Sequence, residues 1–599
     1  MAETVAALVA GHRSGKIPIV STIGRVFRRL AEAADPAIFI SLRAQEAIMA
    51  DASALSQGGT SLALYGVPVA VKDNIDVTGL PTTAACPAFS YMPERDAEAV
   101  ARLKRAGAIV IGKTNLDQFA TGLVGMRSPH GMPRNPLRAD LLSGGSSSGS
   151  AVAVARGIVP LALGTDTAGS GRVPAALNNI VGLKPSLGLV PASGVVPACR
   201  SLDCVSIFAL SVEDAWCALE TIAGHDARDP YARRFVQGGL TDVPLGLRLG
   251  IPRTQDKLFF GDRNAEAGFA AAEKLAVDLG ATLIDVDLTP FLQTALLLYD
   301  GPWVAERTAA VGDFIAKHPD LVHPVTRQII SQGAGKSAVD IFRDFYRLQE
   351  LRGQAHAALI GLDALMVPTM PRCVTVAEVA ADPVGPNSQL GTYTNFVNLL
   401  DLAGIAIPVT LAPDGTAFGV TLLGHAGRDA ALASIGMALH ARTGLPLGAL
   451  GAALPALPNL APGLHSGEVG LAVVGAHRSG MALNHELAAL GARYLETRVT
   501  TPDYRLFELT DSKPAKPGLL RVSTGAGTAI EVETWALSAE TFGRFVATVP
   551  PPLSIGSIRL GDGRLVKGFL VEAESVAGAR DISSFGSWPA FVTSTQPPG

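Results

Sequence analysis

The chain has 599 residues, of which 48% are hydrophobic and 17% charged, a composition typical of a folded globular protein rather than a disordered one. Single cores stop growing at about 250 to 300 residues, so we predict one large domain and one small one. The net charge of −4 gives no basic footprint, which disfavours nucleic acid and anionic membranes as partners and leaves a small molecule as the expected ligand.

The first 443 residues predict a large α/β domain. Alanine-rich stretches around residues 5–10 and 23–34 predict helices on the outside of the core, extending to about residue 60. From residue 67 the pattern alternates: extended at 67–71, helical at 97–106 behind Asp96 as the N-cap, and extended at 108–111. Uninterrupted apolar strands, such as 67–71 and 364–367, indicate a sheet buried on both faces. We therefore predict a mixed sheet in a three-layer α/β/α sandwich.

Residues 444–469 are mostly Pro, Gly, Ala and Leu with almost no charge, which predicts a linker. The uncharged window at 443–463 is long enough to span a bilayer, but four prolines interrupt it. From residue 470 to 599 the pattern indicates a small α+β domain, with a helix at 484–490 and short extended runs at 471–474, 529–536, 555–560 and 568–571.

The five cysteines are an odd number without a C-x-x-C pair, which predicts neither a disulfide framework nor a zinc site. At the N-terminus basic residues follow the apolar stretch, the opposite of the order in a signal peptide. We therefore expect a cytoplasmic protein without a membrane segment.

Two small-residue turns and a lysine predict a proton relay for acyl transfer. Ser146 lies in the glycine-serine run 144–150, and Ser170 ends the turn 164–170. Lys72 ends an apolar strand, where burial would lower the pKa of its amine and make it a usable base without histidine. The proline-containing helix start after Ser170 would supply free N–H groups for an oxyanion.

Three other interpretations of these residues stand beside the relay. The glycine-serine runs could be flexible loops and Lys72 a surface residue. A phosphate loop is poorly supported, since residues 144–150 contain no Gly-Lys-Ser/Thr. Residues 145–149 also satisfy the G-x-S-x-G pattern, which would make Ser147 the nucleophile of an α/β-hydrolase. That hydrolase needs a histidine, and none of the candidates stands in a recognisable turn: His225, His318, His323, His356, His425 and His440.

Residues 66–73, 144–149 and 164–170 together resemble the amidase signature family. This resemblance implies an enzyme without metal or cofactor in which Ser170 is the acyl nucleophile, Ser146 bridges on a cis peptide and Lys72 is the terminal base. It also implies an oxyanion site at the backbone N–H groups of Thr167, Ala168, Gly169 and Ser170. Many members carry glycine where this chain has Ala168, which puts the torsions of that turn in question.

Residues 117–125, residues 298–307 and the C-terminal domain look like those of the allophanate hydrolases within this family. The resemblance implies hydrolysis of allophanate, a small ureide with a carboxylate, to ammonia and carbon dioxide. Arg307 would bind the carboxylate, Tyr299 would be its hydroxyl partner, and Gly122 would belong to the substrate site. Trp303 and Glu306 are expected to be a packing residue and a salt-bridge partner.

Two other arginines compete with Arg307 for the carboxylate. Arg172 and Arg200 both lie near the predicted active-site loops, although Arg172 is plausibly structural. The resemblance further implies a homodimer and functional coupling to a biotin-dependent urea carboxylase. The alternatives are a general small-amide amidase, the glutaminase subunit of a tRNA-dependent amidotransferase, and an interaction protein that keeps the fold as a scaffold.

In the C-terminal domain, His477 stands in a glycine-flanked turn directly after a strand. The domain resembles the γ-glutamyl-cyclotransferase-like domain of allophanate hydrolases, which implies decarboxylation of N-carboxycarbamate with His477 as base or proton donor. A histidine that caps its own turn and a docking surface for partner enzymes are the two alternatives.

Overall fold

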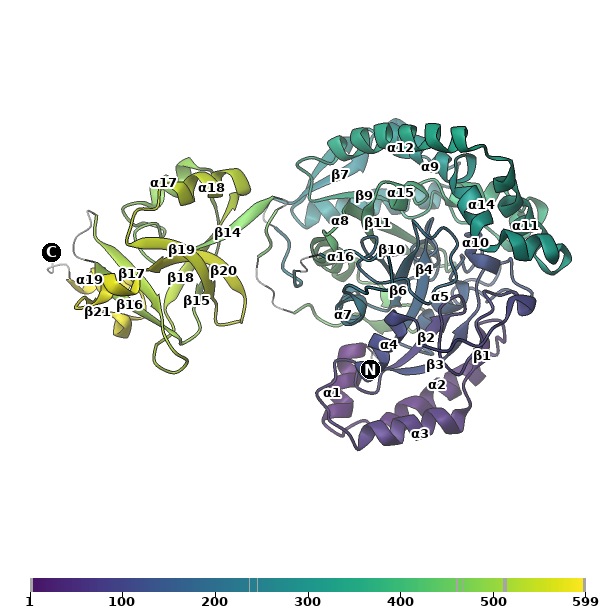
Figure 1. The fold of residues 1–599 in the computed structure, drawn as a ribbon, viewed down its shortest axis with the longest axis horizontal. Helices are drawn as coiled ribbons and strands as arrows, with labels where there is room; N and C mark the ends of the chain where they lie inside the picture. Colours follow the sequence, from purple (N-terminus) through teal and green to yellow (C-terminus); the bar gives the residue numbers. More distant parts are fainter. Residues whose placement is uncertain are drawn as a thin grey trace. The chain divides into compact units, whose positions relative to one another are not determined.

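The computed structural model describes residues 4–235, 238–244, 246–458, 460, 462–465, 467–509 and 514–595. The chain divides into two compact units, drawn in Figure 1. The first comprises residues 1–240 and 246–458, and the second comprises 241–245 and 459–599. The division at residue 458 falls inside the stretch 444–469, but the beginning of that stretch belongs to the first unit, where the side-chain amide of Asn179 donates to the carbonyl of Pro446.

An eleven-stranded mixed sheet forms the centre of the first unit, in the order β1-β3-β2-β4-β6-β5-β10-β11-β9-β7-β8. Strand β2 pairs parallel to β3 and β4, whereas β4 pairs antiparallel to β6, as predicted for a mixed sheet. The strands are β1 (Phe39–Leu42), β2 (Pro68–Lys72), β3 (Ile109–Thr114), β4 (Leu161–Asp166), β5 (Val181–Lys184), β6 (Cys204–Ala209), β7 (Arg248–Pro252), β8 (Thr282–Val286), β9 (Ala364–Pro368), β10 (Leu402–Leu411) and β11 (Ala417–His425).

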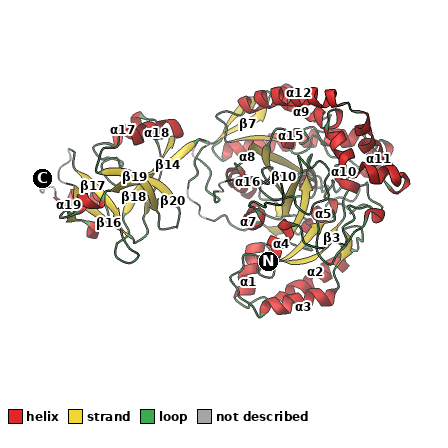
Figure 2. Ribbon diagram, in the orientation of Figure 1, coloured by secondary structure: helices red, strands yellow, loops and turns green. Residues whose placement is uncertain are grey.

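Helices cover both faces of this sheet. Ala176 of α6 fills the space beside Gly419 of β11, whereas Leu422 of the same strand lies beside Gly436 of α16. Positions 419 and 422 point to opposite faces because side chains alternate along a strand. Helices α6 and α16 therefore lie on opposite sides of the sheet, which confirms the predicted sandwich. Figure 2 distinguishes the helices from the strands of the sheet.

The edge strand β1 was not predicted. The helices of the first unit include those predicted around 5–10, 23–34 and 97–106, together with many that were not predicted. They are α1 (Val5–Arg13), α2 (Ile19–Ala33), α3 (Gln45–Ser56), α4 (Glu98–Arg105), α5 (Ser148–Ala155), α6 (Val173–Leu177), α7 (Val212–Ile222), α8 (Arg263–Asp278), α9 (Thr289–Asp300), α10 (Trp303–Lys317), α11 (Pro324–Ser331), α12 (Ala338–Ala358), α13 (Val376–Ala381), α14 (Gly385–Leu390), α15 (Phe396–Leu399) and α16 (Asp429–Thr443).

The predicted N-cap at Asp96 is wrong. Helix α4 starts one residue later than that cap requires, with Ala97 at the N-cap and no side-chain hydrogen bond there. The carboxylate of Asp96 instead accepts the N–H of Thr78 at 2.8 Å and pairs with Lys104. It joins the helix to a neighbouring loop rather than starting it.

The second unit is an α+β domain, as predicted. Its five-stranded sheet has the order β15-β18-β14-β20-β19, and a three-stranded sheet has the order β17-β16-β21. The elements are β14 (Glu468–Val473), α17 (Asn484–Ala489), β15 (Arg493–Val499), β16 (Tyr504–Leu509), β17 (Lys516–Arg521), β18 (Glu531–Ser538), α18 (Ala539–Ala547), β19 (Leu553–Arg559), β20 (Leu565–Val571), β21 (Arg580–Asp581) and α19 (Trp588–Thr595). Across the described ranges of both units, no helix has the length and apolarity needed to cross a bilayer.

Candidate active site

Lys72, the last residue of β2, is fully buried and lies against two hydroxyl groups. Its Nζ donates to Ser146 Oγ and to Thr165 Oγ1, both at 2.7 Å. Thr165 is on β4, which pairs parallel to β2, so strand register fixes this contact. Burial lowers the pKa of Lys72 to about 7, against the attraction of three nearby carboxylates. An uncharged amine is therefore available near neutral pH.

Ser146 follows a cis peptide bond from Gly145, as the family resemblance implied. The loop at residues 117–127 holds this peptide on both sides: Asp117 N–H donates to the Ser146 carbonyl at 3.0 Å, and Gly145 N–H donates to the Leu123 carbonyl at 2.8 Å. A Cβ on Gly145 would overlap the Asp117 carboxylate, and a Cβ on Gly122, whose φ is +146°, would lie 2.8 Å from it. Both glycines let the loop close around Ser146.

Ser170 lies in the buried turn that follows β4. The carboxylate of Asp166 accepts the N–H groups of Gly169 at 2.8 Å and Gly171 at 3.1 Å. Arg172 pairs with the same carboxylate through two hydrogen bonds, at 2.9 and 3.0 Å. Arg172 therefore shapes the turn and is not free for a substrate. Within the described chain, Ser170 Oγ has no hydrogen-bond partner, so only Lys72 and Ser146 of the predicted relay are in contact.

The turn before Ser170 presents backbone N–H groups, but not all of those predicted. Because Gly169 donates to Asp166, its N–H is not free for an oxyanion, which corrects that part of the prediction. In the part of the chain that the structure describes, the N–H groups of Thr167, Ala168 and Ser170 have no acceptor. Ala168 has no positive φ, so the turn does not require glycine at this position.

Asp203 stabilises this turn from a distant loop. Thr167 Oγ1 donates to Asp203 Oδ1 at 2.5 Å, and the N–H of Ala198 donates to the same carboxylate at 2.9 Å. Burial raises the pKa of Asp203 to about 6, against the effect of these hydrogen bonds. The sequence contains no motif that indicates Asp203, because its role depends on a contact across 36 residues.

Arg307 and Tyr299 come together from two consecutive helices. Arg307 of α10 is 2% exposed, donates to Thr121 Oγ1 at 3.2 Å, and has its guanidinium 5.6 Å from the ring centre of Tyr299 in the last turn of α9. No carboxylate of the described residues lies within ion-pair distance of it, and its Nε has no partner. A buried guanidinium with unused donors is suited to bind a carboxylate.

The neighbours of Arg307 differ in part from the prediction. Trp303 is a buried packing residue, in a cluster with Ala168 of the Ser170 turn. Glu306 forms no salt bridge with any described residue; its carboxylate accepts the N–H and hydroxyl of Ser201, both at 2.7 Å. Arg200 is exposed and lies 5.8 Å from the ring centre of Tyr231.

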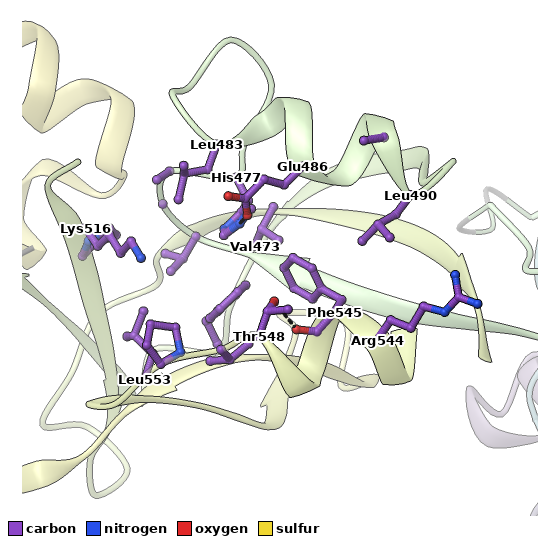
Figure 3. A pocket seen from close by; sticks show the side chains of 18 residues that line it. Val473, His477, Leu483, Glu486, Leu490, Lys516, Arg544, Phe545, Thr548 and Leu553 are labelled. Carbon is purple, nitrogen blue, oxygen red and sulfur yellow. Dashed lines mark hydrogen bonds and ion pairs between the residues drawn. The ribbon is translucent and has the colours of Figure 1, made fainter. Parts of the chain in front are cut away.

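A separate pocket of about 480 Å³ lies in the second unit, around His477 (Figure 3). His477 Nε2 is 2.9 Å from Glu486 Oε2 of α17, and its ring stacks on Phe569 with centroids 5.3 Å apart. Burial lowers the pKa of His477, against the effect of Glu486. Because the ring contacts a different helix and lines a pocket, His477 does more than cap its own turn. Over the described ranges, no group of three or more His, Cys, Asp or Glu side chains is placed to hold a metal ion.

Comparison with known proteins gives two family matches. Residues 23–433 match the family described as amidase, and residues 469–593 match the family described as allophanate hydrolase C-terminal domain. The chain is 45% identical over 550 residues to urea amidolyase of Lachancea kluyveri, which covers 89% of this chain but 30% of that protein. It is 36% identical to a glutamyl-tRNA(Gln) amidotransferase component of Symbiobacterium thermophilum, over 64% of this chain and 84% of that one. Among solved structures, allophanate hydrolase of Kluyveromyces lactis has a TM-score of 0.80 and 40% identity, and the match covers 99% of each chain.

Proposed function

Since this chain belongs to the amidase family, we propose that it hydrolyses an amide C–N bond with Ser170 as nucleophile, Ser146 as proton bridge and Lys72 as base. The observation that carries this proposal is the 2.7 Å contact between the buried Lys72 amine and the hydroxyl of a serine on a cis peptide. A lysine whose pKa is about 7 can be neutral and take a proton at the pH at which it works.

In the proposed reaction, Ser170 Oγ attacks the substrate carbonyl while its proton passes to Ser146 and the Ser146 proton passes to Lys72. The oxyanion lies against the N–H groups of Thr167, Ala168 and Ser170, which lack acceptors among the described residues. The tetrahedral intermediate collapses as the leaving amine takes the proton back through the same hydroxyls. Water then hydrolyses the acyl-enzyme by the same relay, which restores Ser170.

We propose allophanate as the substrate. Its carboxylate would pair with Arg307, and Tyr299 and Gly122 would contact the rest of the small ureide. A buried cation without a counter-ion among the described residues supports an anionic substrate, since an unpaired charge is costly to bury. The names of the similar Lachancea and Kluyveromyces proteins, and the C-terminal family match, agree with this choice. The products of this step would be ammonia and N-carboxycarbamate.

We propose that the C-terminal pocket carries out a second step, the decarboxylation of N-carboxycarbamate. One C–N bond breaks, carbon dioxide leaves, and the electron pair stays on nitrogen, which takes a proton from the protonated form of His477. Carbamate remains, and His477 regains a proton from water. Glu486 orients the ring and opposes the loss of its proton. The largely apolar surroundings of His477 favour release of a neutral gas. Replacing His477 with Gln would slow the second step and leave the first ammonia unchanged.

The proposal extends to the partners of the chain. The chain spans 30% of the length of the urea amidolyases that it matches, so these relatives carry a similar segment within a much longer polypeptide. This arrangement supports functional coupling to a biotin-dependent urea carboxylase that would supply allophanate in the cytoplasm. We also propose a homodimer, which sedimentation equilibrium would test.

The experiment that tests the proposal compares ammonia release from allophanate with release from biuret, malonamide and glutamine. We expect allophanate to have the highest kcat/KM and Ser170→Ala to abolish release from every substrate. A fluorophosphonate adduct on Ser170 would exclude a scaffold without activity, and an adduct on Ser147 would support the α/β-hydrolase alternative. A preference for glutamine would overturn the assignment in favour of the amidotransferase class, which also matches this chain.

A further inference from the structure

Lys516, the first residue of β17, belongs to the lining of the His477 pocket. Figure 3 shows its side chain reaching into the pocket from the side opposite Arg544, with its amine directed toward His477. Strand β17 pairs antiparallel to β16, so Lys516 lies at the end of a sheet that does not contain His477. The pocket therefore combines an imidazole and an ammonium from different parts of the domain.

The approach of Lys516 to His477 depends on Gly475. A Cβ at Gly475 would overlap the ring of Pro517, the residue that follows Lys516. The glycine thus lets the start of β17 lie directly against the turn that carries His477. Burial is the main cause that lowers the pKa of His477, and the positive charge of Lys516 adds to the lowering.

Lys516 forms no ion pair with a described residue of the pocket. The carboxylate of Glu486 contacts the imidazole of His477 instead. Arg544 is paired with Glu540, and its guanidinium is directed away from the pocket in Figure 3. Among the described residues, Lys516 has no carboxylate partner and its amine donates to no acceptor. The remaining lining is largely apolar: Val473, Leu483, Leu490, Phe545, Leu553 and Phe569.

We propose that Lys516 binds a carboxylate of the pocket's ligand, so that the pocket selects small anions. An ammonium in an apolar lining favours an anion, because the anion supplies the charge-assisted hydrogen bond that the protein does not. This inference rests on the proposed second reaction for its biological ligand. In that reaction Lys516 binds the carboxylate that remains on the product. A cation on the other carboxylate, the one that leaves, would oppose its conversion to neutral carbon dioxide.

Malonate is the probe that tests this inference, because it has the two carboxylates of N-carboxycarbamate with CH₂ in place of NH. Binding is followed through the imidazole NMR signals of His477 in the full chain labelled at histidine, assigned by comparison with His477→Gln. This readout is specific to the pocket even if malonate also occupies the amidase site. Malonamide, which has the same shape without charge, is the ligand control, and it is added to Ser170→Ala so that the amidase site does not convert it to an anion.

The wild-type protein is expected to show a saturable shift of the His477 signals with malonate, and Ser170→Ala is expected to show none with malonamide. Lys516→Met should weaken malonate binding about tenfold or more, the range of one charge-assisted hydrogen bond, and Lys516→Arg should retain most of it. Lys567→Met is the matched control, since Lys567 is an exposed lysine of the same domain outside the pocket. Unchanged signals of the other histidines would show that each variant is folded.

Two results would overturn the assignment: no shift of His477 with malonate, or equal malonate affinity in wild type and a folded Lys516→Met. The proposed reaction fails separately. If His477→Gln releases carbon dioxide as fast as wild type while malonate binding still requires Lys516, the anion site stands and the decarboxylation does not. If His477→Gln slows carbon dioxide release and Lys516→Met does not affect malonate, the reaction stands and the role of Lys516 falls.

Discussion

The buried amine of Lys72 makes the pH dependence of acylation a quantitative test of the relay. If the base titrates with a pKa of about 7, its neutral fraction rises from about 9% at pH 6 to about 91% at pH 8, and then levels off. The value of kcat/KM should therefore rise about tenfold over these two pH units and reach a plateau above pH 8. An amine with an ordinary pKa near 10.4 would give about a hundredfold rise over the same interval and no plateau until about pH 11.

The assay measures ammonia release from malonamide at concentrations below KM, because this substrate has no titrating group in the range. The variant Thr165→Val removes one of the two hydroxyl groups that Lys72 contacts and retains the shape of the side chain. A neutral amine is better tolerated there than an ammonium, which loses a hydrogen bond, so the midpoint should move to lower pH. A slope of one that continues through pH 9 in the wild type would refute Lys72 as a base with a lowered pKa.

Three further predictions follow from individual contacts. Arg307→Met should raise KM for allophanate at least tenfold and spare malonamide, with Arg343→Met, an exposed arginine, as the control; an equal loss on both substrates in steady-state kinetics would remove the specificity role. Gly145→Ala should abolish activity because its Cβ overlaps Asp117. The control Gly353→Ala lies in open space on α12 and should raise the melting temperature slightly. An active Gly145→Ala would show that the loop around Asp117 can move to make room for the methyl group. Arg172→Met should lower the free energy of unfolding in urea by about 3 to 5 kcal/mol, since it leaves the Asp166 carboxylate buried and unpaired; a change below about 1 kcal/mol would mean that water reaches this carboxylate.

The sequence was sufficient to predict buried strands but not most individual side-chain contacts. The apolar run that ends in Lys72 was enough to predict a buried strand, because only a sheet covered on both faces tolerates such a run. The cis peptide before Ser146 was expected from the family resemblance alone. Position 145 is occupied by glycine because a Cβ there would overlap Asp117. For the strand, the determining residues are neighbours in the chain.

Two of the contacts that the sequence did not predict join distant segments. Asp203 reaches Thr167 across 36 residues, and Thr165 reaches Lys72 across 93. Gly169 was predicted to donate to an oxyanion, but the carboxylate of Asp166, three residues before it, accepts its N–H. Asp96 was predicted as an N-cap, yet the carboxylate pairs with Lys104. A local pattern identifies a polar group but not its hydrogen-bond or ion-pair partner, because the fold determines which groups come together.

The presence or absence of an ion-pair partner distinguishes cationic side chains with a structural role from those available to bind a ligand. Arg172 is buried and fully matched by Asp166, so its charge is used to shape the nucleophile turn. Arg307 is also buried, but no carboxylate of the described residues lies within ion-pair distance of it, and the half-buried Lys516 forms no ion pair with a described residue. Because an unmatched buried charge destabilises the fold, a ligand carboxylate at Arg307 would remove a cost. Both proposed reactions act on anions. The substrate carboxylates would therefore supply the ion-pair partners that Arg307 and Lys516 lack among the described residues.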